Sequence, residues 1–157
     1  MPPTARCLIL ACGNTLRTDD GLGPWLANRA ATYFADRDEV RILARQQWTP
    51  DLAEDLAQAR AALFLDCSVA SAPGEISLLP VEPSTMSALY GAHHLDAASL
   101  LALSRDLYGV FPARALQLTV GAGSLALGES FSPTVTAALA VLQARLIQST
   151  EELLALA

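Results

Sequence analysis

Short apolar runs alternate with helical patterns along this chain, and the alternation limits the fold more than any other feature of the sequence. The runs at residues 6–11 and 61–67 are continuously apolar, which predicts strands buried on both faces. The predicted strands are residues 6–11, 39–44, 61–67, 75–79 and 115–120. The predicted helices are residues 23–34, 50–58, 95–108 and 133–156. Strands alternating with helices predict an α/β three-layer sandwich, in which a mostly parallel sheet of about five strands carries helices on both faces.

Two helix starts can be predicted from local chemistry. Thr49 is a suitable N-cap before Pro50 at a first helical position, and Ser132 precedes Pro133 in the same way. The carboxyl ends of parallel strands are where ligands bind in such sheets. Residues directly after the first and third strands are therefore the first candidates for a site.

Length and hydropathy predict one soluble domain. The 157 residues are 52% hydrophobic, which suits a single domain spanning residues 1–157 with a sizeable core. No apolar run reaches the roughly 18 residues that a membrane span requires. The first residues lack the basic stretch and long apolar segment of a signal peptide. We therefore expect a cytoplasmic protein that does not enter a membrane.

Charge and cysteine usage exclude several classes of function. The net charge is −6 with no basic cluster, so no nucleic-acid surface is expected. All basic residues are Arg, which excludes a P-loop lysine, a Schiff-base lysine and a Ser-Lys dyad. The three cysteines, Cys7, Cys12 and Cys67, are odd in number and form no C-x-x-C motif, which predicts free thiols.

The segment CGNTLRTDDGLG at residues 12–23 connects the first strand to the first helix. Its carboxylates, Asp19 and Asp20, would repel a pyrophosphate, and the G-x-G-x-x-G spacing is missing, so a dinucleotide site is disfavoured. The spacing of acids also differs from a calcium-binding EF-hand loop. Two interpretations of Asp20 stay open at this point: a cap of the first helix, or a site residue.

Two further features lie where a site is expected. Asp66 ends the buried third strand, where a carboxylate is costly unless it is paired, hydrogen-bonded or coordinated. The only histidines, His93 and His94, precede a helix. One histidine with two carboxylates suits a divalent metal that keeps open coordination positions. A competing hypothesis pairs Cys12 or Cys67 with His93 as a nucleophile.

Four segments carry a resemblance to a known family. GNTLRTDDGLG at residues 13–23 resembles the G-N-x-L-x-x-D-[DE]-G-x-G signature of the hydrogenase maturation proteases. The segments LFLDCS, GAHHLDAASLL and FSPTV resemble later segments of that family, in the same order along the chain. The resemblance covers nearly the whole chain. It implies a mostly parallel sheet of about five strands with one antiparallel strand, between helices.

The resemblance also implies an activity. It is that of an endopeptidase, which removes the C-terminal extension from the precursor of a [NiFe]-hydrogenase large subunit after nickel insertion. The partner is that precursor, and the nickel is carried by it. The positions that contact metal and support cleavage map onto Asp20, Asp66 and His93. Either a metal-polarised carbonyl or water, or a carboxylate base such as Asp19 or Asp66, would drive hydrolysis.

The sequence departs from the family pattern in four places. Ala11 replaces a usual glycine, Asp96 stands where a glycine usually follows the histidine, and RQQWTPDLAEDL replaces the commoner D-G-G-T-x-G pattern. GAGSLALGES at residues 121–130 replaces the G-I-[EQ]-P stretch. This last change keeps an alternative open, namely a non-catalytic metal-binding hydrogenase assembly factor with the same fold.

Overall fold

The computed structural model describes residues 5–85 and 95–157 of the chain. One sheet of five strands runs through the centre, in the spatial order β2-β1-β3-β5-β4. The strands are β1 (Ala5–Cys12), β2 (Val40–Arg45), β3 (Ala59–Ser68), β4 (Ile76–Pro80) and β5 (Arg114–Gly121). Only the β4–β5 pairing is antiparallel. The predicted α/β class and mostly parallel sheet are confirmed.

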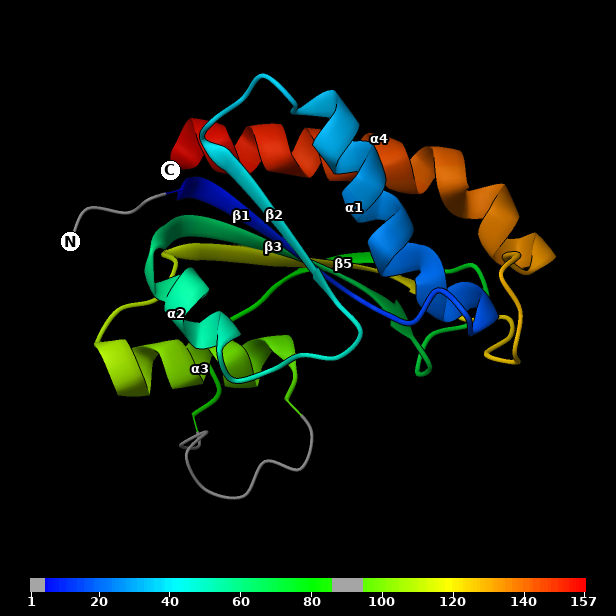
Figure 1. The fold of residues 1–157 in the computed structure, drawn as a ribbon, viewed down its shortest axis with the longest axis horizontal. Coiled ribbons are helices and arrows are strands. Elements are labelled where there is room, and N and C mark those ends of the chain that lie inside the picture. Colours follow the sequence, from blue (N-terminus) through cyan, green and yellow to red (C-terminus); the bar gives the residue numbers. More distant parts are fainter. Residues whose placement is uncertain (1–4, 86–94) are drawn as a thin grey trace.

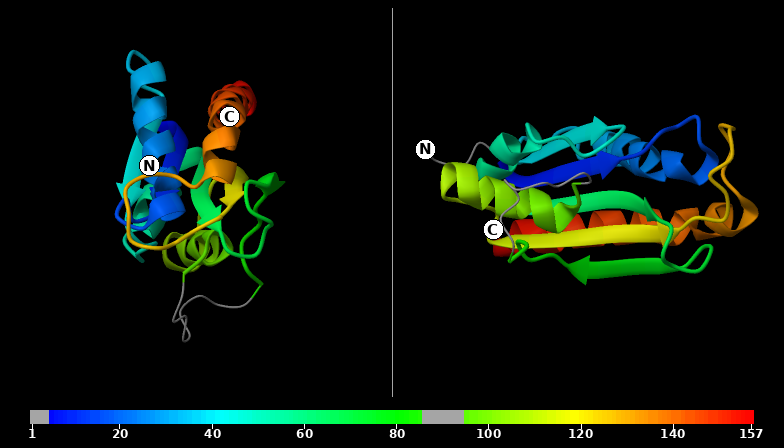
Figure 2. Two further views of the ribbon diagram at one scale, coloured as in Figure 1. Left: turned by 90° about the vertical axis from the view of Figure 1, so that its right-hand side faces the viewer. Right: turned by 90° about the horizontal axis from the view of Figure 1, so that it is seen from below.

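Helices cover both faces of this sheet, as the alternation predicts (Figures 1 and 2). The helices are α1 (Leu22–Tyr33), α2 (Leu52–Ala57), α3 (Ala97–Tyr108) and α4 (Pro133–Leu156), with a short 3-10 helix, η1 (Thr18–Gly21), before α1. α1 and α4 pack on one face, and α2 and α3 on the other. No helix in residues 5–85 and 95–157 is long and apolar enough to cross a membrane.

The central strands separate two apolar cores. In β1, Cys7, Ile9 and Ala11 face α1 and α4, whereas Leu8 and Leu10 face α2 and α3. All five side chains are fully buried. Side chains of a strand alternate between faces, so a strand covered on both sides must be apolar throughout. This explains the continuous apolar runs from which β1 and β3 were predicted.

The order of the strands creates a topological switch point between β1 and β3. The connection that leaves β1 through α1 leads to β2 on one side, while β3 and β5 lie on the other side. The loops that leave the two strands therefore diverge, and in open parallel sheets ligands bind beyond the carboxyl ends of the strands at such a point. The loop after β1 contains Asp20, and β3 contains Asp66 close to its end.

Two helix starts differ from, or refine, the sequence prediction. α2 begins at Leu52, because residues 49–52 first form a turn in which the Leu52 amide donates to the Thr49 carbonyl. Thr49 is thus wrongly predicted as the N-cap, and its Oγ1 is enclosed without a hydrogen-bond partner among the described residues. Ser132 is the N-cap residue of α4 by position, but its side chain makes no capping bond and is used elsewhere.

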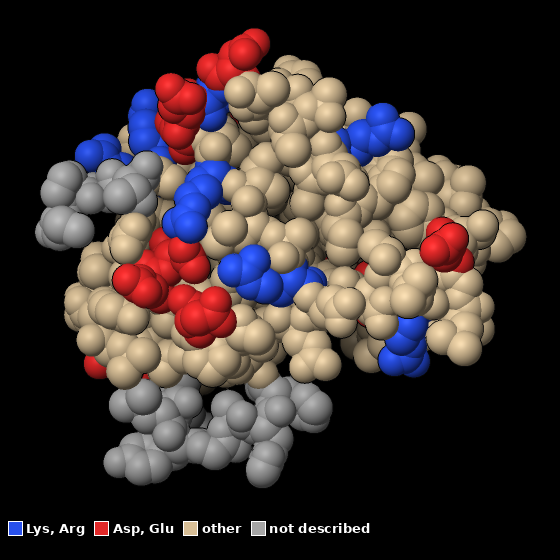
Figure 3. All heavy atoms as spheres, viewed as in Figure 1, with Lys and Arg blue, Asp and Glu red and all other residues tan. Residues whose placement is uncertain are grey.

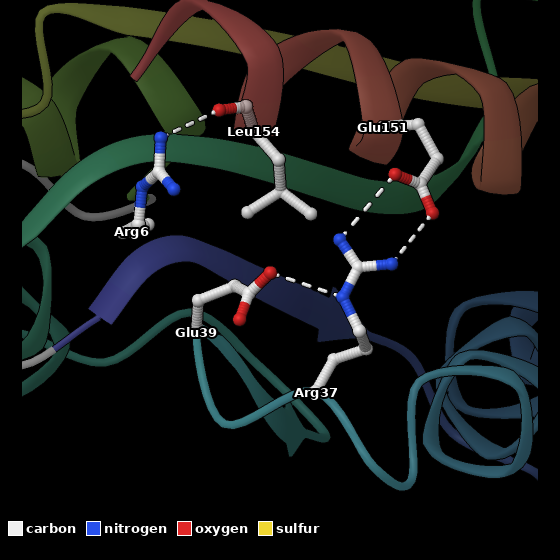
Figure 4. A network of polar contacts seen from close by, with 5 residues as sticks. All are labelled: Arg6, Arg37, Glu39, Glu151 and Leu154. Atoms are coloured by element: carbon white, nitrogen blue, oxygen red, sulfur yellow. Dashed lines mark hydrogen bonds and ion pairs between the residues drawn. The ribbon is translucent and has the colours of Figure 1, made fainter.

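Two arginines near the starts of β1 and β2, at the end of the sheet away from Asp20 and Asp66, contact the last turns of α4 (Figure 4). The Arg6 guanidinium donates to the carbonyl oxygens of Leu154 and Ala157 at 3.0 and 2.9 Å. Arg37 forms ion pairs with Glu39 and Glu151, both at 3.0 Å. The Arg6 contacts satisfy carbonyls at the end of α4 that have no partner within the helix.

Candidate functional site

The candidate site lies at the carboxyl ends of β1 and β3, and it is built from two loops and two strand ends. Asp20 is in η1, directly after the turn that leaves β1, and one of its carboxylate oxygens accepts a hydrogen bond from the Asn14 amide at 2.8 Å. The N-cap position of α1 is Gly21, not Asp20. The cap interpretation of Asp20 is therefore wrong. Through this hydrogen bond, the carboxylate of Asp20 stabilises the turn between Asn14 and Asp20. Its second oxygen, Oδ1, does not take part in this bond.

Asp66 and Asp20 are brought together by the switch point. The pKa of Asp66 is raised to about 7 by burial first, with the negative charge of Asp20 adding to the shift. A hydrogen bond from the Cys67 amide, at 2.7 Å, opposes the shift but does not cancel it. A carboxyl with a pKa near neutrality can exchange protons at physiological pH. Its altered pKa at a strand end marks Asp66 as a site candidate.

His93 lies outside the residues that the structure describes, and so does His94. Within the described ranges, no group of three His, Cys, Asp or Glu side chains is placed to hold a metal ion. The two carboxylates supply oxygen donors of the kind that divalent metals accept, so they fit two of the three predicted ligand positions. All three ligand positions, Asp20, Asp66 and His93, stay predictions from the sequence.

The two thiols beside the carboxylates are free and protonated. The pKa values of Cys12 and Cys67 are both raised to about 12, by burial first and then by negative charges. These charges are Asp66 and Asp20 for Cys12, and Asp66, Asp19 and Asp20 for Cys67. Cys12 Sγ lies 3.5 Å from the Gln46 carbonyl, to which it donates. A thiolate is the reactive form of cysteine, and this environment suppresses it. The raised pKa values of the two thiols therefore disfavour the cysteine nucleophile considered from the sequence.

Asp19 has a role that the sequence did not reveal. Its side chain is fully buried. One oxygen accepts from the amides of Gly123 and Ser124 and from Ser132 Oγ, at 2.7, 2.9 and 2.7 Å. The other oxygen accepts from the Ser132 amide at 2.8 Å. Burial acts to raise the pKa of Asp19, but these hydrogen bonds outweigh it and lower the pKa.

This arrangement, here called the Asp19 clamp, comprises Asp19, Gly123, Ser124 and Ser132. It joins the loop after β1 to the loop after β5 through four hydrogen bonds, three to one carboxylate oxygen of Asp19 and one to the other. Asp19, considered above as a base, is thereby committed to structure, and Asp66 is the better candidate. Ser132 was predicted as a helix cap, and no signal in the sequence linked it to Asp19.

Backbone pairing extends the contact between the same two loops. Arg17 and Gly128 form a parallel β-bridge, and the Thr18 amide donates to the Gly128 carbonyl at 2.8 Å. The Gly128 amide donates in turn to the Leu16 carbonyl at 2.9 Å. The Gly-rich segment 121–130 thus has a structural purpose beside the candidate site.

The end of the molecule that carries these loops is mostly uncharged on the face in Figure 3, whereas charged side chains gather towards the other end.

The first helix approaches the end of β1 so closely that only glycine fits. A Cβ at Gly23 would collide with the carbonyl oxygen of Cys12. A Cβ at Gly13, which has φ of +152°, would collide with the carbonyl oxygen of Asp20. These glycines of the resembling motif therefore let the loop fold tightly and hold Asp20 above the switch point.

Gly23→Ala is expected to lower the free energy of unfolding by about 1–3 kcal/mol, because the added methyl group forces α1 away from β1. Urea unfolding followed by circular dichroism measures this change. Asn28→Ala, at an exposed position of α1, is the control and is expected to alter stability by less than about 0.5 kcal/mol. A Gly23→Ala variant as stable as the natural protein would contradict the close packing described here.

Comparison with known proteins supports the fold. No protein-family model matches the sequence, and no curated protein does. Solved structures do match. The hydrogenase maturating endopeptidase HybD from E. coli is 23% identical, with a TM-score of 0.74, and the match covers 94% of this chain and 93% of that one. The [NiFe] hydrogenase maturation protease HycI from Thermococcus kodakarensis is 21% identical, with a TM-score of 0.68, over 96% and 92% of the two chains.

A third match is the hydrogenase 2 maturation peptidase from the Thaumarchaeota archaeon SCGC_AB-539-E09. It is 22% identical, with a TM-score of 0.65, over 93% of this chain and 98% of that one. The chain has the hydrogenase maturation endopeptidase fold. The resemblance drawn from four sequence segments is thereby confirmed as a shared fold over most of the chain.

Proposed function

We propose that this protein is a processing endopeptidase that removes the C-terminal extension of a nickel-loaded [NiFe]-hydrogenase large-subunit precursor, in the cytoplasm. The observation that carries the proposal is the meeting of Asp20 and Asp66 at the switch point of this fold. Structures that share the fold are named endopeptidases and maturation proteases. The four sequence segments that resemble the family support the same conclusion.

In this proposal the nickel belongs to the substrate, and Asp20, Asp66 and His93 are the protein groups that meet it. Nickel in this position would polarise the scissile carbonyl or acidify a bound water molecule. Asp20 is held by the Asn14 amide and therefore presents its carboxylate in a fixed direction. Asp66, with a pKa of about 7, is suited to accept a proton from the attacking water.

The thiols and Asp19 take no direct part. The pKa values of about 12 keep Cys12 and Cys67 protonated at neutral pH, where they are poor nucleophiles. The carboxylate of Asp19 is enclosed by its four hydrogen bonds. In this proposal, hydrolysis depends on Asp20, Asp66, His93 and the nickel of the precursor.

Substitution of the proposed ligands tests the assignment. Asp20→Ala and His93→Ala are expected to abolish processing of a nickel-loaded precursor while the far-ultraviolet circular dichroism and the unfolding transition persist. Asp36→Ala, an exposed carboxylate after α1, is the matched control and should process normally. Normal processing by both Asp20→Ala and His93→Ala would remove these residues from the proposed site.

A non-catalytic assembly factor is the second candidate function, and the changed segment 121–130 is the observation that favours it. That segment supplies the amides of Gly123 and Ser124 to the Asp19 clamp. Its composition therefore has a structural explanation that does not require loss of cleavage. We accordingly favour the endopeptidase.

A further inference from the structure

One face of β5 carries polar side chains, although this strand lies inside the sheet between β3 and β4. Leu118 and Val120 belong to the core under α1 and α4. Side chains alternate along a strand, so Gln117 and Thr119 lie on the opposite face, which carries α2 and α3. Such alternation is typical of a strand that has one face outside the core. The face of β5 that contains Gln117 and Thr119 therefore is not completed as core.

The strand register places Thr119 beside Asp66 in one row across the sheet. Thr119 is the register partner of Asp66 in β3 and of Ser77 in β4. The sequence neighbours Leu65 and Leu78 pack in the core under α1 and α4, so the three side chains of the row lie together on the α2 and α3 face. Neighbouring strands are about 4.8 Å apart. A ligand that reaches Asp66 on this face therefore also meets Thr119.

The hydroxyl groups of Ser77 and Thr119 and the amide group of Gln117 are uncommitted. All three side chains are half-buried, and within residues 5–85 and 95–157 none of them has a hydrogen bond. The right-hand view of Figure 2 looks onto this face. Among the described elements, α3 covers one end of the sheet there and leaves β4 and β5 without a covering helix towards the carboxyl end of β5. These polar groups are therefore available to a ligand that lies on this face.

We propose that Ser77, Gln117 and Thr119, here called the polar strip, bind the extended segment of the precursor that flanks the scissile bond. This inference rests on the proposed function, because it takes Asp66 as the place of cleavage. Hydroxyl and amide side chains both donate and accept, so they match the N–H and C=O groups of a peptide backbone. An anionic ligand is disfavoured, since Asp66 stands in the same row and the charge of Asp20 acts on it. Contacts to the backbone orient the peptide at Asp66 without selecting its side chains.

Kinetics with the nickel-loaded precursor test the polar strip. Thr119→Val keeps the shape of the side chain and removes its hydroxyl, and it should raise KM about tenfold with kcat changed by less than about twofold. Gln117→Leu should raise KM by a similar factor. Thr119→Ser keeps the hydroxyl and should retain a KM close to that of the natural protein. Thr32→Val, at an exposed position of α1, is the control and should leave KM unchanged.

Stability separates substrate binding from a structural role of these side chains. Because neither Thr119 nor Gln117 has a hydrogen bond within the described residues, the urea midpoints of Thr119→Val and Gln117→Leu should equal or exceed that of the natural protein. Lower midpoints together with lost activity would assign the two side chains to the fold and overturn the inference. An unchanged KM in both variants would also overturn it, while cleavage by the natural protein would leave the endopeptidase standing.

A binding measurement distinguishes failure of this inference from failure of the proposed function. Affinity for the nickel-loaded precursor is measured by isothermal titration calorimetry in the Asp66→Asn background, where no cleavage is expected. Addition of Thr119→Val should weaken this affinity about tenfold. If it does so while the natural protein cleaves no precursor, the polar strip stands and the endopeptidase fails. Absence of binding to every loaded precursor would overturn both.

Discussion

Asp66→Asn is expected to abolish processing of the precursor and, at the same time, to stabilise the protein. Loss of a proton acceptor and metal ligand should reduce the rate of processing by at least about 100-fold. The amide keeps an oxygen to accept the hydrogen bond from the Cys67 amide, so the strand end stays intact. It removes the cost of burying a charge beside Asp20, which is what raises the pKa of Asp66 to about 7.

The sign of the stability change follows from the two pKa values of Asp66. Its pKa is about 7 in the folded protein and about 4 in the unfolded chain, so between these values the folded state binds more protons. The stability of the natural protein therefore falls as pH rises from about 4 to about 7. Because Asn does not titrate, the advantage of Asp66→Asn should grow through this window and reach about 1–3 kcal/mol at pH 8.

Urea unfolding at pH 5 and pH 8, together with a processing assay, measures both effects. Asp38→Asn replaces an exposed carboxylate between α1 and β2 and serves as the control, with no change expected in either assay. Normal processing by Asp66→Asn would exclude Asp66 from catalysis. A variant less stable than the natural protein at pH 8 would contradict the raised pKa.

Asp19→Ala is expected to lower the free energy of unfolding by about 3–5 kcal/mol, because it leaves several buried donors without an acceptor. The donors are the amides of Gly123, Ser124 and Ser132 and the Ser132 hydroxyl. Asp19→Asn should cost less than Asp19→Ala, since its oxygen can keep three of these hydrogen bonds while its amide nitrogen faces only the Ser132 amide. Urea unfolding at pH 7 gives the values, and Asp36→Ala, which is exposed, is the control.

The pH dependence of Asp19 is opposite to that of Asp66. The pKa of Asp19 is lowered in the folded state, so its stabilising effect is fully present above the unfolded pKa of about 4. That effect disappears as pH falls through the lower, folded pKa. The difference in stability between the natural protein and Asp19→Asn should therefore shrink in strong acid. Equal stability of the two proteins at pH 7 would refute the clamp.

The order of elements could be predicted from local pattern, whereas the neighbours of each strand could not. β1 and β3 were predicted within three residues at each end, because continuous apolar runs are a strong signal for strands covered on both faces. The sequence did not show that β1 lies between β2 and β3. The spatial order of the strands depends on how helix faces pack against the sheet. This order creates the switch point between β1 and β3.

The candidate site was predictable only in part. Asp20 could be selected because it follows a buried strand, and Asp66 because it lies near the end of one. The resemblance added His93, which lies outside the described residues. Asp19 and Asp20 are adjacent and chemically identical in the sequence. Contacts with residues more than one hundred positions away give Asp19 a structural role and leave Asp20 at the site. Such distant contacts leave no local signal.

The measurement that tests the central claim most directly is a processing assay with the natural protein. Purified protein would be mixed with candidate hydrogenase large-subunit precursors, with and without nickel, and the products weighed by mass spectrometry. The proposal predicts loss of a C-terminal peptide from the nickel-loaded form of one precursor only. A stable complex with a loaded precursor but no cleavage of any would contradict it and favour the assembly factor.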